Sequence, residues 1–94
     1  MVNPEEISVS AIAVWMLAEI DREDIVYQDT LVYEIERRFG PSFTYVNDNG
    51  NSAIRRDVLT AFRNISETTV VWNRRDRAWR KREPRDEPGR QQLD

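Results

Sequence analysis

The stretch that most constrains the fold is an amphipathic helix pattern that runs directly into a hairpin pattern. From a cap at Asn51 or Ser52, apolar residues recur at offsets of 4, 7, 8 and 11 residues, which is the spacing of one helix face. Residues 69–72 and 78–82 then alternate as two strands around an arginine-rich turn at 73–77. Two strands alone bury too little apolar surface to be stable, so we expect them to pack on this helix. The expected helix stripe contains Ile54, Val58, Ala61, Phe62 and Ile65, and the expected covering residues are Val70, Trp72 and Trp79.

The N-terminal part predicts a first helix. Asn3 and Ser8 are alternative caps, with a proline and two acidic residues in the first turn after Asn3. We expect the helix to give way to a charged loop at 21–24 and then to a short strand at 25–27, which is β-branched and aromatic. The core stripe of the helix contains Val9, Ile12, Ala13, Met16 and Ile20.

A second helix is indicated after this short strand. It should begin near Gln28 or Asp29 and stop at Gly40, which we expect to form a left-handed cap before Pro41. Residues 43–46 read as an extended segment, closed by a strong turn signal at 47–50. The core stripe of the second helix contains Leu31, Val32, Ile35 and Phe39.

The first helix also carries a second apolar stripe beside its core stripe, so it is apolar nearly all round. Such a helix has to be covered on both sides. Two hypotheses account for the second stripe: other parts of the chain, such as the C-terminal tail, cover it, or it is an interface with a second copy or a protein partner. The stripe contains Ile7, Ala11, Val14 and Ala18.

Composition favours one small domain. The chain has 94 residues, of which 39% are hydrophobic, and this suits a single modest core. We assign residues 1–83 to the domain and 84–94 to a polar tail, because the tail contains two prolines, a glycine and one aliphatic residue. There is no cysteine, no signal-peptide pattern and no apolar run long enough to span a bilayer. We therefore expect a cytoplasmic protein with no membrane role.

Charge is distributed unevenly along the chain. The net charge is −3, but residues 1–50 hold 10 acidic and 3 basic side chains, whereas residues 51–94 hold 7 acidic and 11 basic ones. Residues 72–82 alone contain six basic residues and one acidic residue, Asp76. Such a segment either attracts the phosphates of a nucleic acid or is a solvated edge that prevents aggregation. The candidate nucleic-acid-binding residues are Arg74, Arg75 and Arg77 of the turn and Arg55, Arg56 and Arg63 of the third helix, which we expect to lie exposed beside them.

The sequence argues against an enzyme. It contains no histidine and no cysteine, so the usual general bases and nucleophiles near neutral pH are missing, and its carboxylates form no evident pair. The turn at 47–50 has one aspartate and lacks the spaced acids of a calcium loop. We predict no catalytic residues, no metal, no cofactor and no small-molecule substrate.

The expected order of helix, short strand, helix, helix and hairpin resembles the winged-helix architecture over residues 8–82. The predicted fold class is therefore α+β and winged-helix-like, with three helices, a C-terminal hairpin wing and short additional strands. One departure is the insertion at 40–51, where a winged helix usually has a tight turn. This resemblance favours a small binding module for nucleic acid, with a protein adaptor or inhibitor as the alternative.

The chain also resembles a family of short uncharacterised bacterial and mobile-element proteins with a domain of unknown function. The motifs that carry this resemblance are the string at 43–51, the pairs Val58-Leu59 and Phe62-Arg63, and the ending from Trp79 through 92. The resemblance implies a fold and a free-standing protein, and it brings no functional residues.

Overall fold

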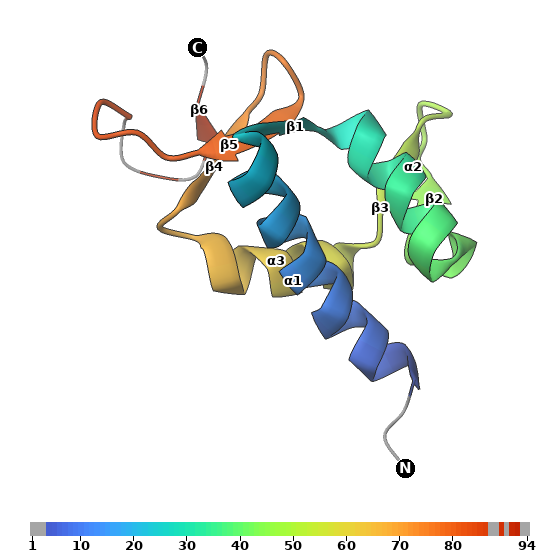
Figure 1. Cartoon of the computed structure of the whole chain (residues 1–94). Coiled ribbons are helices and arrows are strands. Elements are labelled where there is room, and N and C mark those ends of the chain that lie inside the picture. Colours follow the sequence, from blue (N-terminus) through green and yellow to red (C-terminus); the bar gives the residue numbers. More distant parts are fainter. Residues whose placement is uncertain (1–3, 87–88, 90, 93–94) are drawn as a thin grey trace.

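The computed structural model describes residues 4–86, 89, 91 and 92, and it has an α+β fold. The described chain begins with a helix, and its last three elements are strands (Figure 1). The helices are α1 (Pro4–Glu23), α2 (Gln28–Phe39) and α3 (Arg56–Ser66), with a 3-10 turn, η1, at Pro41–Phe43. The strands are β1 (Ile25–Tyr27), β2 (Thr44–Val46), β3 (Ser52–Ile54), β4 (Val70–Asn73), β5 (Ala78–Lys81) and β6 (Gln91–Gln92).

The strands form two small sheets. The larger sheet has the order β1-β5-β4-β6, in which β4 and β5 are the predicted hairpin and β1 joins the outer side of β5. All pairs in it are antiparallel except β4 with β6, which is parallel. The smaller sheet pairs β2 with β3. This arrangement of three helices and small antiparallel sheets is compatible with a winged-helix-like fold.

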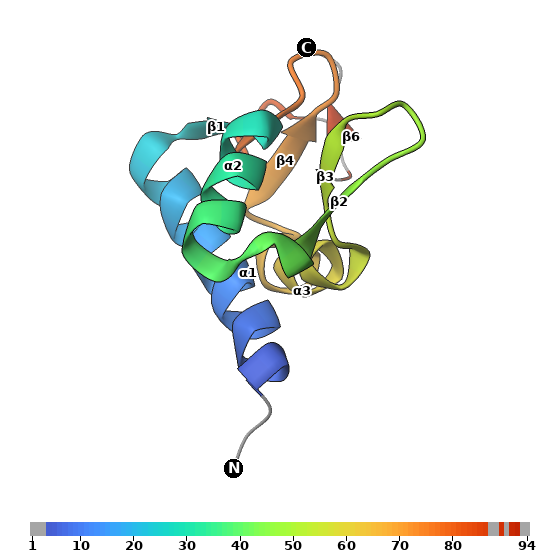
Figure 2. The same cartoon turned by 90° about the vertical axis from the view of Figure 1, so that its right-hand side faces the viewer.

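The core lies between the larger sheet and two helices. In both views, α1 and α3 lie together below the sheet, with α2 and the β2–β3 hairpin beside them (Figures 1 and 2). Phe62 of α3 packs edge-on against Trp79 of β5, with 5.7 Å between the ring centroids, and Trp79 also packs against Trp72. The hairpin therefore covers α3, as the sequence predicts. The predicted stripe residues Ile12, Met16, Leu31, Ile35, Val58 and Phe62 are all buried.

The start of α3 differs from the prediction. Ser52 and Ile54 belong to β3, which pairs with β2, and the helix begins only at Arg56, with Arg55 as its N-cap. The extended segment after η1 needs a partner for its backbone groups, and the residues after the turn provide it. Ile54 is buried as predicted, although from a strand. Ile65, which was predicted to be core, is 44% exposed, and the buried residue at this end of α3 is Ser66, whose hydroxyl donates to the Phe62 carbonyl.

Two other predicted boundaries also change. The expected loop at 21–24 is wrong, because α1 continues to Glu23 and is followed directly by Asp24, which has a positive φ of 69°. Gly40 does end α2 with a positive φ of 102°, and its N–H donates to the Glu36 carbonyl, but its ψ of 161° is extended rather than left-handed helical. The candidate cap Asn3 lies outside the described residues.

The second stripe of α1 is not covered by the described part of the chain. Ala11 and Ala18 are exposed, and the Val14 side chain is 61% exposed. The side chain of Ile7 lies outside the described part. The core stripe on the other side of the helix is buried except for Val9, which is half-buried, and Trp15 between the two stripes is half-buried against Phe39.

The fold continues past residue 83. Asp86 lies over the larger sheet, and β6 adds to the free side of β4, with Trp72 opposite Gln91 and Asn73 opposite Gln92. The described tail residues therefore pack against the sheet and not against α1. Of the tail, residues 87, 88, 90, 93 and 94 lie outside the described residues.

Candidate nucleic-acid interface

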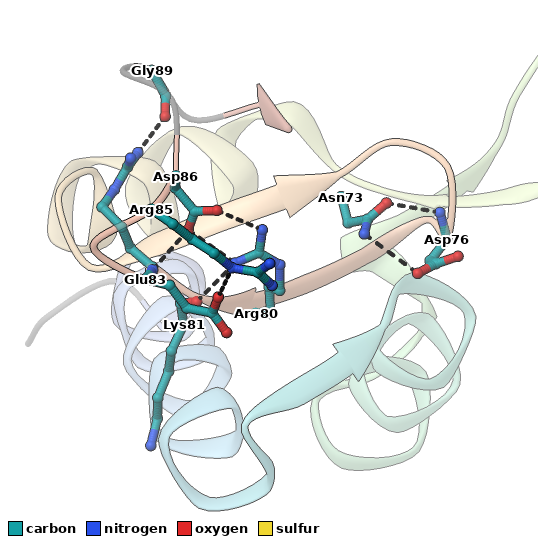
Figure 3. A network of polar contacts seen from close by, with 9 residues as sticks. Asn73, Asp76, Arg80, Lys81, Glu83, Arg85, Asp86 and Gly89 are labelled. Carbon is teal, nitrogen blue, oxygen red and sulfur yellow. Dashed lines mark hydrogen bonds and ion pairs between the residues drawn. The ribbon is translucent and has the colours of Figure 1, made fainter. Parts of the chain in front are cut away.

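The turn between β4 and β5 presents three arginines on a defined backbone. Asn73 is buried, and its side chain spans the turn (Figure 3): its Oδ1 accepts from the Asp76 N–H at 3.0 Å, and its Nδ2 donates to the Asp76 carboxylate at 3.3 Å. Arg77 has a positive φ of 52°, and its carbonyl accepts from the Gln28 N–H at 2.9 Å. These hydrogen bonds fix the turn against the start of α2.

The arginine side chains of this turn point into solvent. Arg74, Arg75 and Arg77 are all exposed, and within the described ranges no ion pair holds Arg74 or Arg77. Asp76, the only acidic residue of the turn, already accepts hydrogen bonds from Asn73. The turn therefore has a local excess of positive charge.

The other three basic residues of the hairpin are used within the fold. The Arg80 guanidinium forms a two-pronged pair with Asp86, at 2.9 and 2.8 Å, and the two side chains are only 11% and 4% exposed (Figure 3). Lys81 pairs with Asp24 at 2.9 Å, and Arg82 donates to the carbonyl of Gly89. The six basic residues of this segment thus divide into three exposed arginines at the turn and three engaged cations at its base.

The pair between Arg80 and Asp86 is the strongest charge interaction of the hairpin. Hydrogen bonds from Arg80, and a further one from the Glu83 N–H at 2.7 Å, hold the pKa of Asp86 well below its usual range. Asp86 is therefore ionised at neutral pH, and it neutralises a cation that lies opposite Val71 on β4. This pair anchors the described part of the tail on the sheet.

The arginines of α3 have different environments. Arg55 was expected to be exposed but is half-buried: it donates to both carboxylate oxygens of Asp57 and, at 3.0 Å, to the Ser42 carbonyl, and its guanidinium lies over the Phe43 ring at 5.2 Å. Arg55 also lowers the pKa of Asp57. It therefore joins η1 to the start of α3. Arg56 is exposed, and Arg63 is exposed with Glu67 at 4.0 Å.

The structure separates the turn arginines from those of α3. Strand β4 leaves the end of α3 and runs away from it, so that the turn lies at the far end of the sheet in both views (Figures 1 and 2). The expectation that the six arginines lie side by side is wrong for this reason. The turn forms one basic group, and Arg56 and Arg63 lie apart from it on α3 (Figures 1 and 2).

The residues that organise the hairpin were not predicted from the sequence. Asn73 was read only as part of a turn, although an Asn before a loop often hydrogen-bonds to the backbone further along. Asp86 was assigned to a separate tail because of its neighbouring prolines. The available signal was an acidic residue six positions after Arg80, which is weak because opposite charges at that spacing are common in a chain with 33% charged residues.

Within the described ranges, no helix is long and apolar enough to cross a membrane. The same part of the chain contains no group of three or more carboxylates, histidines or cysteines that could hold a metal ion.

The chain is a small α+β domain in which the turn of one hairpin carries three exposed arginines. Residues 8–81 match the model of a family described as a family of unknown function, DUF6953, and the chain belongs to this family. No curated protein and no solved structure matches the chain.

Proposed function

We propose that this protein is a small binding module that associates with the phosphate backbone of nucleic acids through the turn between β4 and β5. The observation that carries the proposal is the division of the hairpin cations: Arg80 and Lys81 at the base are paired with carboxylates of the fold, whereas the arginines of the turn are exposed, and Arg74 and Arg77 form no ion pair within the described ranges. Exposed arginines next to one another contact consecutive phosphates and release bound counterions, which drives association even when the net charge of a protein is negative.

The contact is directed at the backbone and not at base edges. Arginine can read guanine in a groove, but the turn lies away from α3 (Figures 1 and 2), the helix that a winged helix would place in that groove, and residues 74–77 include no aromatic side chain that could stack on a base. Arg56 and Arg63 belong to α3, which lies away from the turn (Figures 1 and 2), and the donors of Arg55 are largely occupied, so we assign no phosphate contact to α3. Binding should therefore show little sequence preference.

The test is a fluorescence anisotropy titration of labelled random duplex, single-stranded DNA and RNA. Three phosphate contacts predict that log affinity for duplex falls with log salt with a slope of about −2.7, at roughly 0.9 per contact. If none of the three nucleic acids binds at about 50 mM salt, where electrostatic attraction is strongest, the basic turn is a solvated edge and the proposal fails.

A second candidate function is supported by α1. Its Ala11, Val14 and Ala18 are exposed in a row, which leaves an apolar surface that a second copy or a protein partner could cover. In this alternative the protein is an adaptor, or an inhibitor from a bacterial mobile element, and the contact involves α1 or the acidic first half of the chain.

Sedimentation of the purified protein tests the homodimeric form of this alternative. We expect Val14→Glu to dissociate the dimer without lowering the unfolding midpoint, because the side chain is exposed in the single chain, and Val14→Ala should have a smaller effect. A wild-type protein that is monomeric at high micromolar concentration would exclude the homodimer.

A further inference from the structure

A groove lies between α1, β1 and α2. It has a volume of about 250 Å³ and is lined by Trp15 and Glu19 of α1, by all of β1, and by Leu31 and Glu34 of α2. This volume is below the roughly 300 Å³ at which small-molecule pockets begin. It suits one side chain together with the backbone that carries it.

Strand β1 presents an unpaired edge to this groove. On the side of β1 that faces β5, the Lys81 N–H donates to the Asp24 carbonyl, and the Gln28 N–H donates to the Arg77 carbonyl. In an antiparallel pair every second residue directs its backbone groups to the partner strand, so residues 24, 26 and 28 face β5. The N–H groups of Ile25 and Tyr27 must then point away from β5. Since β1 is an edge strand in the order β1-β5-β4-β6, these donors face the groove, and no strand of the described residues accepts from them.

The charges around the groove favour a ligand with a basic group. Its lining contains three carboxylates and two guanidinium groups, so it has an excess of one negative charge. Glu19 is held by Arg22, and Glu34 is held by Arg37 at 2.8 Å and Arg38 at 3.1 Å. These arginines are about half-exposed or more, so their pairs are weak and exchangeable. Trp15 adds an aromatic wall, over which the Arg38 guanidinium already lies at 5.4 Å.

We propose that this groove binds an extended peptide segment of another protein, which adds to the edge of β1 and inserts a lysine or arginine side chain between Glu19 and Glu34. The alternation of side chains along a strand sets the motif. The peptide residue opposite Val26 shares the face of Val26, toward the helices, and should be basic. Its two neighbours lie beside the exposed Ile25 and Tyr27 and should be apolar.

The experiment is a calorimetric titration of the full chain with a blocked Thr-Val-Lys-Val-Thr peptide. A matched peptide with glutamate in place of lysine should bind at least about tenfold more weakly, because it places a like charge beside Glu19 and Glu34. The decisive variant is Tyr27→Pro, which removes the outward N–H. Tyr27 has φ −78° and ψ 144°, and proline adopts this backbone without strain. We expect this variant to raise the Kd for the lysine peptide at least about fivefold, as for one lost backbone hydrogen bond.

Tyr27→Ala is the control, since it removes the same side chain and keeps the N–H. It should bind the peptide more tightly than Tyr27→Pro, and circular dichroism should show both variants folded. If Tyr27→Pro does not fold, Glu19→Gln and Glu34→Gln replace it and should each weaken binding of the lysine peptide but not of the glutamate peptide. Three results would each overturn the proposal. The two peptides could bind with equal affinity, or neither could bind at about 1 mM. The third is self-association of the protein through β1 that Tyr27→Pro abolishes.

Discussion

The turn and the base of the β4–β5 hairpin are equally rich in cations, and the structure gives them opposite roles. At the base, Arg80 pairs with Asp86, six residues further along the chain, and Lys81 pairs with the distant Asp24, so their charge is used to hold the tail and the end of α1 against the sheet. At the turn, Arg74 and Arg77 have no such partner in the part of the chain that the structure describes. The number of cations in a segment therefore overestimates the attraction of that segment for phosphates. The attraction depends on which of the cations are already paired with carboxylates of the fold.

The first test of this comparison concerns the core beneath the base of the hairpin. Phe62 is 1% exposed and packs on Trp79, so Phe62→Ala should lower the free energy of unfolding by about 3–5 kcal/mol. A urea melt measures the change. A loss below about 1 kcal/mol would show that α3 and the hairpin do not share a core. The exposed Arg74→Ala serves as the control and should stay within about 0.5 kcal/mol.

The second test concerns the anchor at the base. Asp86→Asn leaves Arg80 without its anionic partner, so the urea midpoint at pH 7 should fall. The folded-state pKa of Asp86 is lowered, so its contribution to stability is fully present above about pH 5 and is lost progressively as the pH falls below that value. The variant should therefore lose less stability on acidification than the wild type does.

Glu83→Gln provides the matched control for the anchor. It changes a carboxylate in the same segment that pairs with the exposed Arg85, and it keeps the Glu83 N–H that donates to Asp86. Its midpoint should stay close to the wild-type value. An equal fall of the urea midpoint in Asp86→Asn and Glu83→Gln would mean that Asp86 does not anchor the tail, and that the cations at the base are no more engaged in the fold than those of the turn.

The third test concerns the turn. Arg77→Gly removes a cation at a position with a positive φ of 52°, which glycine adopts readily, so stability should change by less than about 0.5 kcal/mol. The salt dependence of duplex binding should become shallower by about one unit. A fall in stability with an unchanged slope would give Arg77 a structural role like that of Arg80.

The smallest expected effect is at α3. Arg63 is exposed and lies 4.0 Å from Glu67, so Arg63→Ala should cost at most about 0.5 kcal/mol. It should also leave the salt slope unchanged, because α3 lies at the far end of the sheet from the turn (Figure 1). A slope that is shallower by one unit would instead place α3 on the phosphate-binding surface.

The helices, the hairpin and most of the core follow from sequence because they depend on local periodicity. The stripes of α1 and α2 and the alternation around 73–77 each identify an element and its buried face. The β2–β3 pair was missed because the spacing from Ile54 to Val58 fits a helix as well as a strand that ends just before one. Pairing between strands is a tertiary contact, and local periodicity does not specify it.

The basic turn was also identified from sequence, but its separation from α3 was not. Strand β4 alone determines that separation, because its direction carries the turn away from the helix. The roles of Asp86 and Asp24 could not be predicted for a related reason. Both are ordinary surface residues until the fold brings them to Arg80 and Lys81. Exposure of the second stripe of α1 was one of two alternatives that the sequence left open.

The most direct test of the central claim is the salt dependence of duplex binding for the wild type and for an Arg74→Gln/Arg77→Gln double variant, measured side by side by fluorescence anisotropy. The double variant keeps every charge at the base of the hairpin and removes two from the turn. We predict that its slope of log affinity against log salt is shallower by about two units, with an unchanged unfolding midpoint. The same slope in both proteins would contradict the claim that the cations of the turn bind phosphates while those of the base hold the fold.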